Sequence, residues 1–537
     1  MLRISEIKLP LDHSENAVKS AVLAKLQISD AELIDFKIFK RSSDARRKSA
    51  IVFVYIVDAE TTNEAELLTR FKNDPHITET PDTTYKLVGH APKDLKIRPI
   101  IIGTGPCGLF AGLMLARMGF RPIILERGKS VRERSADTFG FWRHGGLNTE
   151  SNAQFGEGGA GTFSDGKLYS QVKDSKHLGR KVLTEFVEAG ANSEILYVNK
   201  PHIGTYKLVK IVENMRATIE SLGGEIRFQA RVEAIEIEDH KVRGVTLSNG
   251  EFIESRHVVL AVGHSARDTF QMLFERGVYI EPKPFSIGFR IEHPQSLIDE
   301  CRFGAEAGNK LLGAADYKLV HHCRNGRSVY SFCMCPGGMV VAAASEEGKL
   351  VTNGMSQYSR SEKNANSAIV VGITPETDYP ENALAGIEFQ RRFEEKAFRL
   401  GGATYKAPAQ LVGDFLKGRP STAFGKVLPS YTPGIVLTDL SEALPKFAIE
   451  AIREAIPAFD KQIKGFAMND AILTGVETRT SSPIRIKRRD DGQSLNTRGL
   501  FPAGEGAGYA GGILSAGIDG IKAAEAVALN ILRYISS

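Results

Sequence analysis

The chain has few cysteines, a single tryptophan and no long hydrophobic run. Its 537 residues include only five cysteines, and this odd, low number favours a reducing compartment over a disulfide framework. No apolar stretch approaches the roughly 20 residues that a membrane-spanning helix needs, and the first residues lack the apolar segment of a signal peptide. We therefore expect a cytoplasmic protein without a membrane contact.

Neither sign of charge dominates. The 69 lysines and arginines exceed the 64 aspartates and glutamates by only five, and an excess this small does not by itself indicate nucleic-acid binding. The hydrophobic content of 42% is that of an ordinary globular protein. The length allows roughly two to four domains with large cores.

Residues 1–95 alternate strand and helix patterns in the order βαββαβ, which predicts a small ferredoxin-like domain. Its last strand is expected at residues 85–89, with the sequence YKLVG. A hairpin in this region carries a run of basic residues: Lys37, Lys40, Arg41, Arg46, Arg47 and Lys48. Such a run is more often a solvated loop than a contact for a polyanion, and both interpretations stay open.

Residues 98–128 have the pattern strand, glycine turn, helix and strand, which is typical of a nucleotide-binding unit. Gly103 allows the tight turn, Gly105 lets the backbone approach a pyrophosphate, and Gly108 lets the helix pack close to the strand. The start of the helix would face the phosphates. Glu126, after the second strand, can accept hydrogen bonds from ribose hydroxyls and would repel a 2′-phosphate. The pattern predicts a dinucleotide other than NADP.

The same glycine spacing occurs twice more, but neither copy can begin a second βαβ unit. One copy follows a polar stretch instead of a strand, and the other leaves only 26 residues after its last glycine, which is room for one helix. The copies lie at Gly156, Gly158 and Gly161, and at Gly506, Gly508 and Gly511. The chain therefore holds one complete dinucleotide fold.

The later glycine segments resemble those of flavoproteins with the glutathione-reductase-like FAD fold. A strand that ends in a small-residue turn lies at residues 257–266, and a strand, a Gly-Glu pair and a final helix lie at residues 499–526. The resemblance implies one non-covalent FAD, with Glu505 near its ribityl–pyrophosphate section. It also implies that the last helix points its N-terminus at the N1–C2=O edge of the flavin, where a helix dipole stabilises negative charge.

Four segments, FGEGGAGTFSDGKL, SFCMCPGG, GVETRTSSPIRI and FPAGEGAGYAGGI, are together similar to a bacterial family of uncharacterised FAD-dependent dehydrogenases. The similarity covers essentially the whole chain, and its one departure is Glu505 where Asp is commoner. The glycine patterns and the resemblance place these residues at FAD: Gly103, Gly105, Pro106, Cys107, Gly108, Glu126, Arg127, Gly158, Gly159, Ala160, Gly161, Ala261, Gly263, Gly504, Glu505, Gly511, Gly512 and Ile513.

We expect an α/β fold in which a Rossmann-like, glutathione-reductase-like FAD-binding domain carries an inserted α+β substrate domain and the small ferredoxin-like domain. The expected boundaries are 1–95 for the ferredoxin-like domain, 96–269 for the first part of the FAD-binding domain, 270–470 for the substrate domain and 471–537 for the C-terminal return of the FAD-binding domain.

Candidate catalytic residues lie between the FAD segments. Lys167, in a glycine-rich loop expected near the isoalloxazine, could tune the flavin potential, although an ordinary polar turn fits equally well. Arg479 and Arg485 precede the last FAD strand and could clamp a substrate carboxylate, with a structural ion pair as the alternative. His264 could act as a proton donor.

Cys333 and Cys335 could form part of a metal site or a redox dithiol. The turn at residues 325–326 predicts a hairpin that pairs Cys323 with Ser328, which leaves Cys333 roughly 13 Å from the nearby histidines. We therefore expect no metal site. A dithiol and the simple packing of two small side chains stay open, and Cys335 is a catalytic candidate because the Pro-Gly-Gly turn after it could admit flavin or substrate.

These observations favour an FAD-dependent oxidoreductase that transfers a hydride between flavin N5 and a small-molecule substrate. One alternative is a flavoprotein linked to nucleic acid, such as an RNA-modification enzyme, with the basic hairpin as its docking arm. Another is a non-catalytic flavin redox sensor. Because only one dinucleotide fold is present, NADH or NADPH could serve only as a transient electron donor. The oligomeric state stays open.

Overall fold

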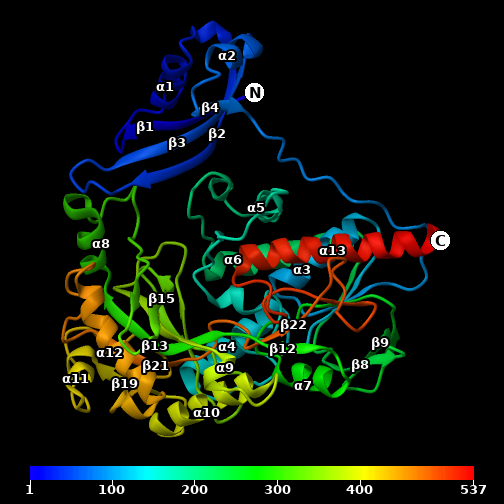
Figure 1. Ribbon diagram of the computed structural model, residues 1–537, viewed down its shortest axis with the longest axis vertical. Coiled ribbons are helices and arrows are strands. Elements are labelled where there is room, and N and C mark those ends of the chain that lie inside the picture. The colour runs from blue at the N-terminus through cyan, green and yellow to red at the C-terminus, as the bar shows by residue number, and fades with distance from the viewer. Residues whose placement is uncertain (537) are drawn as a thin grey trace.

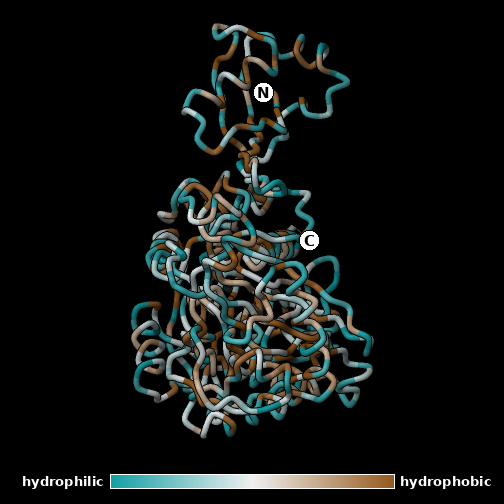
Figure 2. The backbone as a smooth tube through the Cα atoms, turned by 90° about the vertical axis from the view of Figure 1, so that its left-hand side faces the viewer, coloured by the Kyte–Doolittle hydropathy of each residue, from teal (hydrophilic) through white to brown (hydrophobic). Residues whose placement is uncertain are grey.

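The computed structural model describes residues 1–536, with side chains up to residue 533. A small N-terminal unit projects from a larger body, and an extended segment joins the two (Figure 1). Figure 2, turned by 90°, shows the same unit projecting from one end of the body. Among the described residues, no helix is long and apolar enough to cross a lipid bilayer.

The N-terminal unit is a four-stranded antiparallel sheet with two helices, in the strand order β2-β3-β1-β4. Alternate side chains of its strands, such as Leu2, Ile4 and Val57, are buried and form a core of their own. Its elements are β1 (Leu2–Pro10), α1 (Ala17–Leu26), β2 (Leu33–Asp44), β3 (Val52–Thr61), α2 (Glu64–Arg70) and β4 (Ile77–Glu79).

The prediction of a last strand at residues 85–89 is wrong. The last strand of the unit, β4, ends at Glu79. The chain then leaves the sheet because Tyr85 and Val88 pack against the core of the larger body. These apolar residues therefore attach the connecting segment to the body instead of extending the N-terminal sheet.

The β2–β3 hairpin, which carries the basic run, touches the larger body. The amide of Arg41 donates to the carbonyl of Tyr197 at 2.6 Å, and the amide of Asn199 donates to the carbonyl of Arg41 at 2.9 Å. Ile51 is buried in the core of the larger body. The hairpin is therefore held against the segment that precedes Lys200.

The larger body contains a five-stranded parallel sheet in the order β23-β11-β5-β6-β7. Two helices, α3 and α13, pack side by side against it (Figure 1). A Cβ on Gly520 would lie 2.2 Å from the carbonyl of Cys107, so this close approach requires glycine. The elements are β5 (Ile100–Ile102), α3 (Pro106–Arg117), β6 (Ile123–Leu125), α6 (Thr205–Ser221), β7 (Glu225–Arg227), β11 (Val258–Leu260), β23 (Leu500–Pro502) and α13 (Ile513–Ser536).

A three-stranded meander and a helix cover the other face of the parallel sheet. Val232 and Val245 of the meander and Phe270 of the helix share one core with Ile100 and Ile102 of the central strand. These elements are β8 (Val232–Glu238), β9 (Lys241–Leu247), β10 (Phe252–Glu254) and α7 (Arg267–Glu275). The parallel sheet is thus buried on both faces, as its continuous apolar strands predict.

A second, largely antiparallel sheet has the order β14-β15-β18-β13-β21-β19-β20. Its strand β21 follows the boundary expected at residue 470, so this sheet includes six residues that the sequence places in the FAD-binding return. The strands are β13 (Phe285–Pro294), β14 (Val320–His322), β15 (Ser328–Cys335), β18 (Asn364–Ile373), β19 (Ala407–Leu411), β20 (Ile435–Leu437) and β21 (Ile472–Glu477).

Further helices and short strands complete the body. Two long helices, α10 and α12, share one hydrophobic core with the second sheet. The elements are α4 (Val131–His144), α5 (Leu178–Glu188), β12 (Ile280–Pro282), α8 (Gln295–Phe303), β16 (Met339–Ala342), β17 (Thr352–Met355), α9 (Pro375–Asp378), α10 (Ala385–Leu400), α11 (Val412–Lys417), α12 (Lys446–Asp460) and β22 (Ile484–Ile486).

Candidate functional site

A cavity of about 950 Å³ lies where the parallel sheet meets the second sheet. On one side it is lined by the carboxyl ends of parallel strands, through Ile102, Leu125 and Ala261. On the other side it is lined by β15, through Phe332 and Cys333. Ligands of open α/β sheets bind at the carboxyl ends of the strands, so this is where the fold places a nucleotide.

The first glycine turn fits the cavity only because its residues lack a Cβ. Gly103 has φ +101°, and a Cβ there would lie 2.5 Å from the carbonyl of Ala261. A Cβ on Gly108 would lie 1.9 Å from the carbonyl of Gly103. A Cβ on Gly159 would lie 2.7 Å from Cα of Gly105. The two glycine loops therefore touch through bare backbone, which leaves space beside them for a phosphate group.

Glu126 is buried and joins three segments of this wall. Its carboxylate accepts from the amide and hydroxyl of Thr104 at 2.9 and 2.6 Å. It also accepts from the amide of Gly128 at 2.9 Å and from the amide of Gly156 at 3.0 Å. The role of Glu126 as a ribose acceptor stays a prediction, and the hydrogen bonds show a structural role, because this carboxylate holds the two glycine loops together.

Two helices begin at the cavity. Gly105 precedes α3, and Gly512 precedes α13. A Cβ on Gly511 or Gly512 would meet no atom within 4 Å, so both glycines face open space. The first N–H groups of a helix have no partner within it, and the positive end of its dipole attracts anions. The geometry suits a ligand with negative charge at two places.

Of the eighteen residues expected at the dinucleotide, all but two line the cavity. The exceptions, Gly108 and Gly158, lie behind it, where their missing side chains permit close packing. Thr104 and Phe155 also line the cavity, and the sequence prediction missed them. Thr104 lies inside the glycine pattern and could have been inferred from it. Phe155, whose ring centroid lies 4.2 Å from the Arg127 guanidinium, follows no pattern in the sequence.

The wall formed by β15 brings together a lysine and a cysteine. Lys167 lines the cavity, and its Nζ donates to the carbonyl of Met334. Cys333 lines the cavity, whereas Cys335 is fully buried behind it. The catalytic candidate Cys335 therefore does not reach the cavity. Cys333, two residues earlier, lies there instead because of a bulge in β15.

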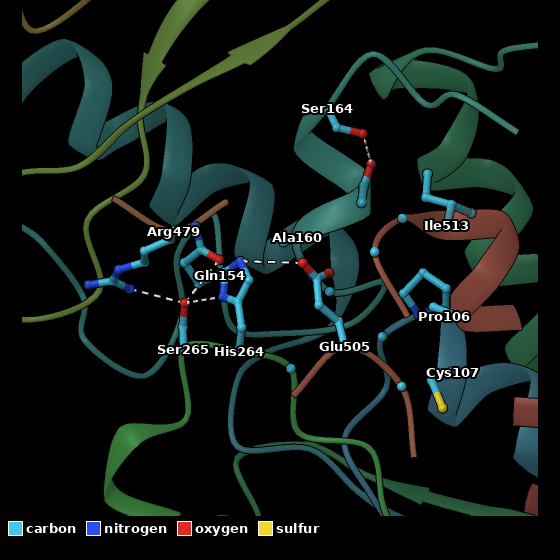
Figure 3. Close-up of a pocket in the computed structure, with 18 of the residues that line it drawn as sticks. Pro106, Cys107, Gln154, Ala160, Ser164, His264, Ser265, Arg479, Glu505 and Ile513 are labelled. Atoms are coloured by element: carbon cyan, nitrogen blue, oxygen red, sulfur yellow. Dashed lines mark hydrogen bonds and ion pairs between the residues drawn. The ribbon is translucent and has the colours of Figure 1, made fainter. Parts of the chain in front are cut away.

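Arg479 lines the cavity, but its guanidinium is committed to the protein. It donates to both carboxylate oxygens of Glu394 at 3.0 and 3.1 Å and to the hydroxyls of Ser265 and Ser345 at 3.0 and 2.6 Å. Figure 3 shows its contact with Ser265. Four of about five N–H donors are thus used. The structural ion pair fits this residue better than a clamp for a substrate carboxylate.

Arg485 does not reach the site. It lies on β22, its side chain is 41% exposed, and its nearest carboxylate is Glu281 at 3.9 Å. It is outside the set of described residues that line the cavity. The expectation that Arg485 clamps a substrate there is corrected, because β22 pairs with β12 and directs the arginine to the surface.

The hairpin of β14 and β15 differs in register from the expected one. Ser328 pairs with His322 instead of Cys323. In the described part of the chain, the one group of three ligand-type side chains within reach of a common ion is His321, Cys323 and Glu454. That group excludes both Cys333 and Cys335, and Arg324 already contacts the Glu454 carboxylate.

Comparisons with known proteins identify the cofactor of this protein as FAD. Three family models match the chain. The model of an FAD binding domain matches residues 96–267, and the model described as "FAD-dependent protein, C-terminal domain-like" matches residues 284–480. A domain of unknown function matches residues 1–60. A Clostridium beijerinckii protein, described as uncharacterized, is 48% identical over 525 residues, which is 98% of both chains. The chain belongs to this family of FAD-dependent proteins.

Solved flavoprotein structures are also similar. The glycerol-3-phosphate dehydrogenase from Bacillus halodurans complexed with FAD is 12% identical, with 82% of this chain and 66% of that chain covered and a TM-score of 0.35. The open conformation of a flavocytochrome c3 fumarate reductase is 12% identical, with 81% and 78% covered and a TM-score of 0.34. A likeness at this level carries no argument about the reaction.

Glu505 and His264 lie next to each other in the lining of the cavity. His264 Nε2 lies 4.0 Å from Glu505 Oε1, and Figure 3 marks the contact between the two side chains. Burial, together with Arg479 and Arg267, lowers the pKa of His264 to about 3. The imidazole is therefore neutral at physiological pH, which does not support its expected role as a proton donor. Burial raises the pKa of Glu505 to about 7, and Lys283 opposes this shift.

FAD affinity should depend on pH through Glu505. Because the pKa of this carboxyl is raised to about 7, it is neutral below that pH and becomes an anion above it. The resemblance implies that Glu505 lies near the pyrophosphate, where an anion would weaken binding, so we expect the dissociation constant of FAD to rise about tenfold from pH 6 to pH 8. Titrations of apoprotein with FAD at several pH values measure this.

The matched control is Glu505→Gln, which keeps the shape and removes the charge. Its dissociation constant should stay flat over the same pH range. A wild-type constant that does not change, or a variant that keeps the full dependence, would assign the titration to another group.

Proposed function

We propose that this FAD-dependent protein is an oxidoreductase that exchanges a hydride between flavin N5 and a small molecule. The observation that carries the proposal is the extent of the cavity. Beyond the glycine loops that suit the nucleotide, it continues along β15 to Tyr169, Asn199 and Lys318. That second part leaves room for a substrate beside the flavin.

The residues present fit FAD. The bare backbone of Gly105 and Gly159 leaves space for the pyrophosphate, and Glu126 holds their loops in place. The start of α13, at Ile513, would face the anionic edge of the flavin. When bound, FAD supplies hydride and electron transfer.

Side chains of the protein would supply charge beside the flavin and hold the cavity wall in place. Lys167, held against the carbonyl of Met334, would keep a cation at the wall where flavin and substrate meet. Arg479 acts as a positioning residue, because its contacts to Glu394 and Ser265 fix the wall beside His264. NADH or NADPH, if used, would dock in the substrate part of the same cavity and leave.

The domain division is also part of this proposal. We assign residues 1–95 to a ferredoxin-like domain, which the strand order β2-β3-β1-β4 supports. We assign residues 96–269 and the C-terminal return to the FAD-binding domain, and the residues between them to the substrate domain. The end of the substrate domain moves to about residue 477, because β21 pairs with β13 and β19.

The link to nucleic acid has less support than the small-molecule reaction. The basic hairpin would need to be free to act as a docking arm, yet Arg41 is held by Tyr197 and Asn199. Arg46, at the tip of the hairpin, pairs with Asp44 at 2.5 Å. The hairpin thus serves a contact within the chain.

The test begins with the cofactor. Acid precipitation of purified protein should release FAD into a yellow supernatant, because the cavity can hold the cofactor without a covalent bond. Compounds that copurify in the cavity are then identified by mass spectrometry and added to the oxidised protein without oxygen. Loss of the visible flavin band on adding one of them supports the oxidoreductase. Colour that stays in the pellet, or flavin that no copurifying compound reduces, would contradict the proposal.

A further inference from the structure

Strand β15 contains a bulge at its cavity end. Phe332 pairs with Ala368 of β18, but Cys335 pairs with Asn366, so two residues of β15 stand opposite Ser367 alone. Those two residues are Cys333 and Met334. Cys333 has φ +46°, a left-handed conformation that non-glycine residues rarely adopt. A bulge of this kind re-aims side chains, and such strain gathers at functional sites.

The bulge places one thiol at the cavity and the other directly behind it. Cys333 lines the cavity, Cys335 is fully buried, and Cys335 Sγ donates to the carbonyl of Cys333 at 3.3 Å. Residues two apart in a strand have Cα atoms about 6.6 Å from each other. That separation lies inside the range that disulfides span, which reaches about 6.8 Å.

Two cationic side chains hold the backbone of residues 333–335. Lys167 Nζ donates to the carbonyl of Met334. Arg290 Nη1 donates to the carbonyl of Cys333 at 2.9 Å, and Arg290 is fully buried. Two carboxylates also approach: Glu477 pairs with Arg290 at 2.8 Å, and the negative charge of Asp165 opposes the lowering of the Cys333 pKa.

The two thiols differ in acidity as a reactive pair does. Hydrogen bonding from Cys335 lowers the pKa of Cys333 well below its ordinary value, and Lys167 and Arg290 lower it further. The same contact raises the pKa of Cys335. A thiolate that faces the cavity, with a protonated thiol beside it, is the starting state for dithiol oxidation.

We propose that Cys333 and Cys335 form a second redox centre, which exchanges two electrons with the flavin bound in the same cavity. In the oxidising direction the two cysteines lose two electrons and their remaining protons, and one S–S bond forms between them. Oxidised flavin takes up both electrons and the matching protons and becomes reduced flavin. The reverse step reopens the disulfide. The proposal rests on the placement of the flavin given under the proposed function, but it requires no particular substrate.

An anaerobic titration of the FAD-loaded, air-oxidised protein with dithionite tests the proposal. Each couple takes about two electrons, so wild-type protein should consume about four electrons per FAD. Cys333→Ser and Cys335→Ser proteins should consume about two. Cys323→Ser is the matched control, because Cys323 is a buried cysteine at the other end of the same hairpin, and it should still consume about four.

Mass spectrometry after alkylation gives a second readout that needs no variant to fold. In the air-oxidised wild-type protein the peptide with residues 333–335 should carry no alkyl group, and after reduction it should carry two. Consumption of about two electrons by the wild type, or two alkyl groups on this peptide before reduction, would overturn the dithiol. Neither result would affect the proposed function, whose own failure would instead be flavin that no small molecule reduces.

Discussion

Replacing Glu126 with alanine should weaken FAD binding about a hundredfold. The carboxylate accepts four hydrogen bonds, from Thr104, Gly128 and Gly156, at 2.6 to 3.0 Å. Without it, buried N–H groups lose their acceptor, and each unsatisfied group costs roughly 1–3 kcal/mol. The loops must then be ordered by FAD itself, so we expect a loss of about 3 kcal/mol in binding free energy. Titration of apoprotein with FAD, followed by flavin fluorescence, measures it.

The control for this experiment is Glu133→Ala. Glu133 lies in the first turn of α4, is exposed, and accepts from the hydroxyl of Ser130 at 2.6 Å. Its replacement should leave the FAD dissociation constant within about a factor of two, as surface substitutions usually do. If Glu126→Ala and Glu133→Ala bind FAD equally well, the carboxylate of Glu126 does not organise the cofactor wall.

Replacing Glu394 with alanine should destabilise the protein by about 3–5 kcal/mol. Glu394 is fully buried in α10 and accepts from Arg267 at 2.7 and 2.8 Å and from Arg479 at 3.0 and 3.1 Å. Removal of the carboxylate leaves two buried guanidinium groups without their shared partner. Urea unfolding of the FAD-loaded protein, followed by circular dichroism, gives the difference.

The neighbouring residue provides the control. Glu395 is 40% exposed and contacts Lys349 and Arg399 at the surface, so Glu395→Ala should change the free energy of unfolding far less than Glu394→Ala does. A similar loss for both variants would mean that the buried cluster contributes no more than a surface pair.

The stabilisation that Glu394 provides should also be lost at acidic pH. Burial alone would raise the pKa of this carboxyl, but Arg267 and Arg479 outweigh burial and hold it well below its ordinary value. A lowered folded-state pKa stabilises the protein above the pKa of the unfolded chain, about 4.3, and the benefit is lost as pH falls through the folded value. The difference in free energy of unfolding between wild type and Glu394→Ala should therefore decrease below about pH 4.

The glycine turn that lines the cavity was predictable from local sequence, because the backbone conformations that it needs depend on residues close together in the chain. Gly103 must adopt a positive φ and Gly108 must touch the carbonyl of Gly103, and only glycine meets both conditions. Glu126 directly follows the second strand of the βαβ unit, 22 residues after Thr104, and the fixed order of strand, helix and strand in that unit returns it to the turn. The second role of Glu126, which joins the loop of Gly156 to the turn, depends on a contact across the fold and could not be inferred.

The sequence by itself determined the glycine-rich turn and the order of elements around it, because backbone conformation and apolar periodicity specify them within a short segment. Only the tertiary structure decided the opposite wall. Arg479 meets Glu394 across 85 residues of chain, Arg485 is directed outward by strand pairing, and Cys333 reaches the cavity in place of Cys335 because of a bulge. Each of these depends on how distant strands align, and register between strands far apart in the chain is set by packing of the whole domain rather than by the residues nearby.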